Sequence, residues 1–188
     1  MTLYLNFRTG GTAGGIVEPY LLEGDGTVRP PAVRALNARE AEERVAGKNV
    51  LFGVHGFNVN YREGAQSFGL LDAHLGLTGP DVFIGVLWPG DWWIPAVNYP
   101  FEGSDAMKCG RLLATFCSQH LAQAQSISFV SHSLGARLVL EALVHLDRQA
   151  RMVCLMAGAI NRDCLLAEYA FATNMAEKIF VLASHNDT

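Results

Sequence analysis

The sequence has few charged residues and no region in which basic residues cluster. Charged side chains make up 17% of the 188 residues and hydrophobic ones 50%, whereas an average soluble domain has roughly 25% charged residues. The net charge is −4 at pH 7. Without a basic stripe, the protein is not expected to bind nucleic acid. The composition instead suits a β-sheet covered on both faces, whose strands need little polar surface.

Several segment types that would assign the chain to other classes are absent. No uninterrupted apolar run approaches the roughly 18 residues of a transmembrane helix, and the start, MTLYLNFRTG, lacks the basic and apolar regions of a signal peptide. We therefore expect no membrane partner. No metal-ligand spacing and no G-x-x-x-x-G-K phosphate loop occurs, so neither a metal nor another cofactor is implied.

The four cysteines show neither CxxC nor zinc spacing. This pattern predicts reduced, buried thiols in a cytoplasmic protein. The residues concerned are Cys109, Cys117, Cys154 and Cys164.

Apolar runs alternate along the chain with segments of helical periodicity. Strands are expected at residues 2–9, 48–57, 81–90, 126–133, 151–160 and 178–187, and helices at 37–47, 61–75, 105–124 and 134–149. A further strand near residues 20–28 is weakly indicated, because its glycines favour a hairpin. The alternation predicts an α/β protein with a doubly wound, mostly parallel sheet. No repeat or linker divides residues 1–188, so a single domain is expected.

Polar residues close several of the apolar runs. In parallel sheets, ligands bind beyond the carboxyl ends of the strands, so these closing residues are expected to converge. The segments are residues 55–58, 88–90, 131–133 and 184–187.

The segment SHSLG, residues 131–135, has the pattern of a nucleophile elbow. A nucleophilic serine must be held clear of the sheet on a sharp strand-to-helix turn, where small residues two positions either side allow close packing. Ser133 would be the nucleophile, with Gly135 after it and Ser131 in place of the usual glycine before it. The alternative is a serine N-cap on an ordinary helix, but the preceding strand and the upstream His-Gly turn favour the elbow.

Four segments together resemble a bacterial family of α/β hydrolases of unknown function, DUF900. They are VHGFNV, LWPG, SHSLGARLVLEAL and IFVLASHND, within about residues 47–187. The resemblance implies the α/β-hydrolase fold and a serine esterase or related acyl hydrolase. It implies Ser133 as nucleophile, Asp187 as the acid of the triad, and an oxyanion hole from the backbone amides of Phe57 and Leu134. Asp163 is a second candidate for the acid.

The catalytic histidine is the residue that the sequence does not supply. In this fold the order is serine, acid, histidine, and Asp187 is followed only by Thr188. His185 is too close to Asp187 in sequence, His132 is expected to point away from the pocket, and His55 is expected to fix its turn. His74, His120 and His145 lie within or near predicted helices.

Two explanations of the missing histidine remain open. In the first, the protein continues past Thr188, in a tail or a separate C-terminal segment that also supplies the fold's last strand and helix. In the second, the protein keeps the fold without activity and acts as a binding protein.

The loop from Trp88 to Phe101 is rich in aromatic residues and proline. It could form the wall of a binding site for an apolar group, or its tryptophans could plug the core above the strand. The candidates for substrate contact are Trp88, Trp92, Trp93 and Tyr99. The sequence thus predicts serine-dependent hydrolysis of a small apolar carboxylic ester, with a catalytically inactive binding protein as the alternative.

Overall fold

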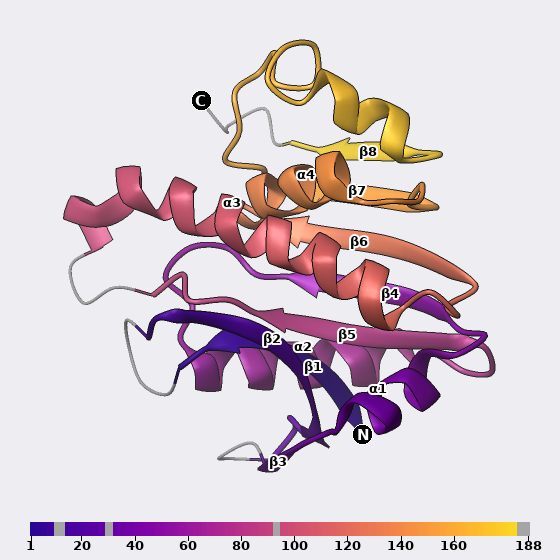
Figure 1. The fold of residues 1–188 in the computed structure, drawn as a ribbon. Helices are drawn as coiled ribbons and strands as arrows, with labels where there is room; N and C mark the ends of the chain where they lie inside the picture. The colour runs from indigo at the N-terminus through magenta and orange to yellow at the C-terminus, as the bar shows by residue number, and fades with distance from the viewer. Residues whose placement is uncertain (10–13, 29–31, 92–94, 184–188) are drawn as a thin grey trace.

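The computed structural model of the chain describes residues 1–9, 14–28, 32–91 and 95–183, and its centre is a single eight-stranded sheet (Figure 1). The strand order is β3-β2-β1-β5-β4-β6-β7-β8. The strands are β1 (Thr2–Arg8), β2 (Ile16–Asp25), β3 (Ala32–Ala35), β4 (Asn49–Val54), β5 (Asp81–Leu87), β6 (Ser126–His132), β7 (Met152–Met156) and β8 (Ile179–Leu182).

The sheet is mostly parallel, which confirms the predicted fold class. From β1 through β5, β4, β6 and β7 to β8, each neighbouring pair is parallel. Only β2 runs against its neighbours β1 and β3. The sequence indicated β2 only weakly and missed β3. Leu21 and Leu22 of β2 are both buried, so packing on the two sides of the sheet outweighs the poor strand propensity of the nearby glycines.

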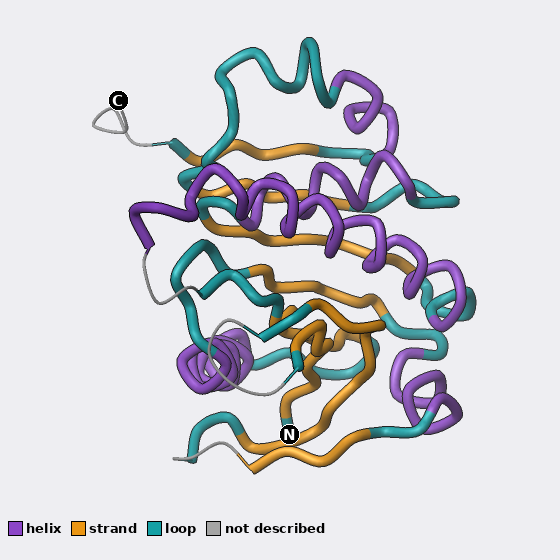
Figure 2. Tube along the Cα trace, turned by 60° about the vertical axis from the view of Figure 1, so that its left-hand side comes forward, coloured by secondary structure: helices purple, strands orange, loops and turns teal. Residues whose placement is uncertain are grey.

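Helices cover both faces of this sheet. Helices α1 (Ala38–Val45) and α2 (Tyr61–Leu75) each begin at an asparagine whose side chain accepts the amide of a glutamate three residues later, with the reciprocal bond also formed. Helices α3 (Pro95–His120) and α4 (Gly135–His145) lie side by side on the face opposite α2 (Figure 1 and Figure 2). A short 3-10 helix, η1 (Ala170–Met175), follows β7.

The start of α3 corrects the prediction of a loop over residues 88–101. The helix begins at Pro95, ten residues before the predicted start at residue 105. Proline suits the first helical position because its missing N–H has no partner there in any case. The proline-rich composition therefore concealed a helix start.

The core lies mainly between the sheet and helices α3 and α4. Phe52 of β4 and Phe129 of β6 stack there with ring centroids 5.4 Å apart. A smaller cluster under α2 contains Phe68 and Phe83. Three cysteines (Cys109, Cys117 and Cys164) are buried as predicted, and Cys154 is half-buried.

Among the described residues, several apolar side chains of β7 and β8 on the α2 face of the sheet are exposed. Residues paired across β7 and β8 that face this side include Cys154 with Phe180 and Met156 with Leu182. Met152, Phe180 and Leu182 are 42%, 46% and 55% exposed. This open face, defined by Met152, Cys154, Met156, Phe180 and Leu182, is apolar.

Within the described ranges, no helix is long and apolar enough to cross a membrane.

Candidate active site

Ser133 occupies a sharp turn between β6 and α4. Strand β6 ends at His132 and α4 begins at Gly135. The backbone of Ser133 has φ 52°, in the left-handed region, which costs a residue other than glycine about 1–3 kcal/mol unless its surroundings hold it there. The Ser133 amide donates to Met156 O over 3.0 Å, and the Ser133 carbonyl accepts from Ala136 and Ala159. A left-handed backbone at this position is typical of a nucleophile elbow, whereas an ordinary N-cap residue has extended backbone.

Close packing at this turn requires Gly135. A Cβ at position 135 would lie 2.6 Å from His55 O and 2.9 Å from Val54 O. The start of α4 therefore rests directly on the end of β4. Ser131, on the other side of the elbow, is 1% exposed, and its hydroxyl has no hydrogen-bond partner among the described residues.

The His55–Asn58 turn lies directly beside Ser133. A Cβ on Gly56 would come within 2.9 Å of the Ser133 Cβ. Asn58 has φ 60° and its amide donates to Gly90 O over 2.6 Å. Three of the four segments predicted to converge thus meet at one edge of the sheet, and the fourth, residues 184–187, lies outside the described residues.

The two residues expected to form an oxyanion hole flank the elbow. Leu134 directly precedes α4, and amides at a helix N-terminus have no partner within the helix. Phe57 is half-buried and follows Gly56, the residue that contacts Ser133.

His55 and Trp88 form the support beneath this turn. The His55 ring bonds through Nδ1 to Gly56 O at 2.8 Å and stacks on the Trp88 indole with centroids 5.5 Å apart. The Trp88 indole N–H donates to His55 O over 2.9 Å. Burial lowers the pKa of His55 to about 4, so the ring is neutral at pH 7.

Trp88 corrects one predicted substrate contact. Its side chain is fully buried, so it plugs the core under the turn and does not line a pocket. Of the other residues expected to contact substrate, Trp92 and Trp93 lie outside the described residues, and Tyr99 lies on α3 with its side chain undescribed.

The remaining candidates for base and acid are spread over several elements. His74 contacts Leu70 O, His145 contacts Glu141, and His120 lies near Glu42. His132 is exposed at the end of β6, and Asp163 is exposed after β7. His185 and Asp187 lie outside the described residues.

A buried ion pair beside the turn escaped sequence reasoning. Arg8, at the end of β1, pairs with Asp91, which follows Gly90, and also donates to Val59 O over 3.4 Å. Burial raises the pKa of Asp91, while Arg8 opposes that shift. No motif spacing relates residues 8 and 91, so only their positions after neighbouring strands could have suggested the pair.

A mostly parallel sheet with a strained serine between a strand and a helix is typical of α/β hydrolases. More narrowly, the chain belongs to the family described as α/β hydrolases of unknown function (DUF900), which matches residues 35–188. No curated protein matches the sequence. Among solved structures, the chain is similar to an inhibited esterase B from Lactobacillus rhamnosis, with 14% identity and a TM-score of 0.40. The similarity covers 84% of this chain, which spans half of the length of that esterase.

Proposed function

We propose that this protein hydrolyses small, apolar carboxylic esters with Ser133 as the nucleophile. The observation that carries the proposal is the positive φ of Ser133 at a strand-to-helix turn in contact with Gly56. A strained backbone at a residue other than glycine is retained where its surroundings over-determine it, and such positions cluster at functional sites. Membership of the α/β-hydrolase family agrees with this proposal.

In the proposed reaction, Ser133 Oγ attacks the ester carbonyl and a tetrahedral intermediate forms. Negative charge develops on the carbonyl oxygen, and the backbone amides of Phe57 and Leu134 are proposed to donate to it. One such donor lowers the barrier by about 3 kcal/mol. The N-terminus of α4 adds a favourable dipole at the same place. Collapse of the intermediate expels the alcohol, and water then hydrolyses the acyl-enzyme.

Serine attack needs a base, and we propose that a histidine outside residues 1–188 supplies it. The segment that carries it would cover the open face of β7 and β8, either as a continuation of the chain or as a separate polypeptide. A ring nitrogen of His55, His74 and His145 already contacts Gly56 O, Leu70 O and Glu141, respectively. Asp187 is proposed to orient the catalytic histidine by accepting its Nδ1–H.

The apolar part of the ester is proposed to contact the aromatic residues Trp92, Trp93 and Tyr99. This proposal is supported by the aromatic composition of the segment that follows strand β5, at the ligand-binding edge of the sheet.

A short p-nitrophenyl ester should be a better substrate than a peptide amide, because the leaving group of an amide needs more help from a proton donor.

The test compares two serine variants in p-nitrophenyl ester turnover. Both are made in the complete protein, which here means residues 1–188 together with the proposed additional segment. Ser133→Ala should reduce kcat to the residual rate left by the oxyanion hole and binding. Ser131→Ala, two residues away and buried, should stay within a few-fold of the parent. Equal activity in the parent and Ser133→Ala would remove Ser133 as the nucleophile. Complete lack of turnover in the parent, across ester chain lengths, would favour the inactive binding protein.

A further inference from the structure

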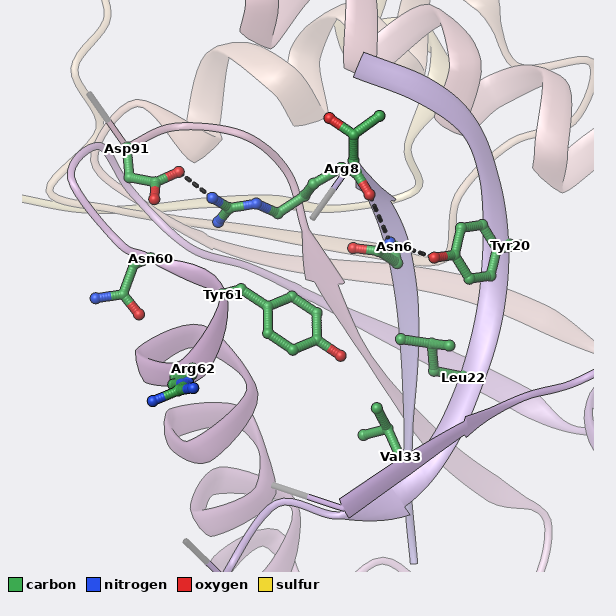
Figure 3. A pocket seen from close by; sticks show the side chains of 10 residues that line it. Asn6, Arg8, Tyr20, Leu22, Val33, Asn60, Tyr61, Arg62 and Asp91 are labelled. Carbon is green, nitrogen blue, oxygen red and sulfur yellow. Dashed lines mark hydrogen bonds and ion pairs between the residues drawn. The ribbon is translucent and has the colours of Figure 1, made fainter. Parts of the chain in front are cut away.

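A pocket lies around the Arg8–Asp91 ion pair, near the turn of residues 55–58, whose Asn58 amide bonds to Gly90 O. It has a volume of about 660 Å³, within the range of roughly 300–1,000 Å³ typical of small-molecule sites. Figure 3 shows its side chains. The lining residues are Asn6, Arg8, Thr9, Tyr20, Leu22, Val33, Asn60, Tyr61, Arg62 and Asp91.

Three of the polar side chains in this pocket are almost completely buried. Asn6, Arg8 and Asp91 are each 3% exposed. Buried polar groups are normally hydrogen-bonded, and an unpaired one needs an explanation. Within the described part of the chain, two buried acceptor atoms of this pocket have no partner: Asn6 Oδ1 and Asp91 Oδ2.

The orientation of the Asn6 carboxamide is fixed by its neighbours. Its nitrogen lies 2.9 Å from both the Arg8 carbonyl and the Tyr20 hydroxyl. Because a carbonyl oxygen only accepts, the atom that bonds it must be the donor nitrogen. The unpartnered atom is therefore the oxygen, and in Figure 3 it points away from Tyr20, into the space between Arg8 and Tyr61.

Asp91 presents its second oxygen to another part of the same pocket. One carboxylate oxygen pairs with Arg8, and the other, Oδ2, is directed toward the side of the pocket where Asn60 and Tyr61 lie (Figure 3). The pocket therefore offers two acceptors without donors, together with the hydroxyls of Tyr20 and Tyr61.

These groups discriminate among classes of ligand. A cationic ligand would meet the guanidinium groups of Arg8 and Arg62. An anionic one would bring oxygen acceptors against the two acceptor oxygens already present. A hydroxyl group can donate to those oxygens and accept from a tyrosine or an arginine, and tyrosine rings offer apolar surface to the carbon skeleton.

We propose that this pocket binds a neutral, polyhydroxylated group such as a sugar, whose hydroxyls donate hydrogen bonds to Asn6 and Asp91. The site is built by the ends of β1 and β5 and by the start of α2, and it is separate from the nucleophile. Its occupancy does not depend on whether Ser133 is catalytic.

Binding is measured on the complete protein carrying Ser133→Ala, so that turnover cannot interfere. The probes are methyl β-D-glucopyranoside, methyl β-D-galactopyranoside and glycerol, compared with inorganic phosphate and n-butylammonium. Calorimetry and saturation-transfer NMR should show saturable binding of at least one glycoside, tighter than that of phosphate or butylammonium. The proposal would be overturned if none of the three polyols bound saturably, or if either ion bound more tightly than the glycosides.

Two further substitutions locate the ligand. Tyr61→Phe removes a pocket hydroxyl and should weaken glycoside binding roughly 3- to 10-fold, whereas Tyr169→Phe, a buried tyrosine outside the pocket, should leave it unchanged. Asn6→Leu should abolish binding if circular dichroism shows that the variant folds; if it does not fold, Tyr61→Phe decides. Equal affinity of the parent and Tyr61→Phe would contradict the proposed site, even if the glycoside binds elsewhere.

Discussion

At position 135, the packing of the elbow leaves no room for a side chain larger than the hydrogen of glycine. A Cβ there would meet two backbone oxygens, of His55 and Val54, neither of which can rotate away. The S-x-S-x-G pattern suggested this constraint, and the structure shows its cause. At position 131 the sequence departs from the usual G-x-S-x-G pattern, and a serine occupies the place of the first glycine.

We predict that Gly135→Ala lowers the free energy of unfolding by about 1–3 kcal/mol through overpacking. The matched control is Gly103→Ala in α3, where the nearest atom to a new Cβ is the Arg137 Cδ at 3.9 Å. That change should stabilise the protein by about 0.5–1 kcal/mol because alanine restricts the unfolded chain more. Urea denaturation of both variants gives the comparison, and no loss in Gly135→Ala would mean that α4 can shift away from β4.

His55 gives the fold a dependence on pH. The pKa of its ring is about 4 in the folded protein, against 6.5 for an unperturbed histidine. Because the pKa of this histidine is lower in the folded protein than in the unfolded chain, the unfolded chain takes up the proton at a higher pH. The contribution to stability is therefore complete above pH 6.5 and is lost as the pH falls toward 4.

We predict that the free energy of unfolding falls by about 2 kcal/mol between pH 7 and pH 5 because of His55 alone. His55→Gln should remove that part of the slope, whereas His74→Gln, on the exposed side of α2, should keep it. Urea titrations at both pH values measure the difference. An unchanged slope in His55→Gln would show that the buried ring is not the group responsible.

The secondary-structure elements could be predicted where local signals agreed with packing. Apolar periodicity marked α1 and α2, and the six parallel strands were visible as apolar runs, whereas the asparagine caps of both helices were recognised only in the structure. β3 was missed because it has four residues and pairs only with β2. The start of α3 was missed because Pro95 signalled a loop. The Arg8–Asp91 pair depends on contacts between residues far apart in sequence, which no local pattern encodes.

The turn of residues 55–58 is proposed to act through its backbone rather than its side chains. Phe57→Ala should therefore retain much of the esterase activity. Phe57→Pro removes the amide and should lower kcat by about 100- to 1,000-fold. Steady-state ester kinetics distinguish the two, with circular dichroism as the check on folding. Equal losses would mean that the ring matters and the amide does not.

At the scale of the whole molecule, the described residues leave apolar side chains of β7 and β8 exposed on the α2 face of the sheet. The exposed side chains include Met152, Phe180 and Leu182, and β8 is an edge strand. Exposed apolar edges favour association with other chains. Exposure of a strand face depends on which elements pack against it, so the sequence could not show which faces are uncovered.

We predict that residues 1–188 produced alone aggregate and have little esterase activity. A serine without a base leaves only the residual catalysis of the oxyanion hole, about 10³–10⁴ over water. Addition of the proposed C-terminal segment, in the same chain or as a peptide, should restore both solubility and turnover. Light scattering and ester assays follow the two effects. Full activity of a monomeric 188-residue protein would contradict the proposed origin of the base and make His185 the first residue to replace.

The most direct test of the central claim is covalent labelling by a fluorophosphonate probe, followed by peptide mass spectrometry. In the complete protein, the account predicts one modified residue, Ser133, with labelling retained in Ser131→Ala and lost in a folded Ser133→Ala variant. Equal labelling of Ser133→Ala, or a modified peptide that does not contain residue 133, would contradict it.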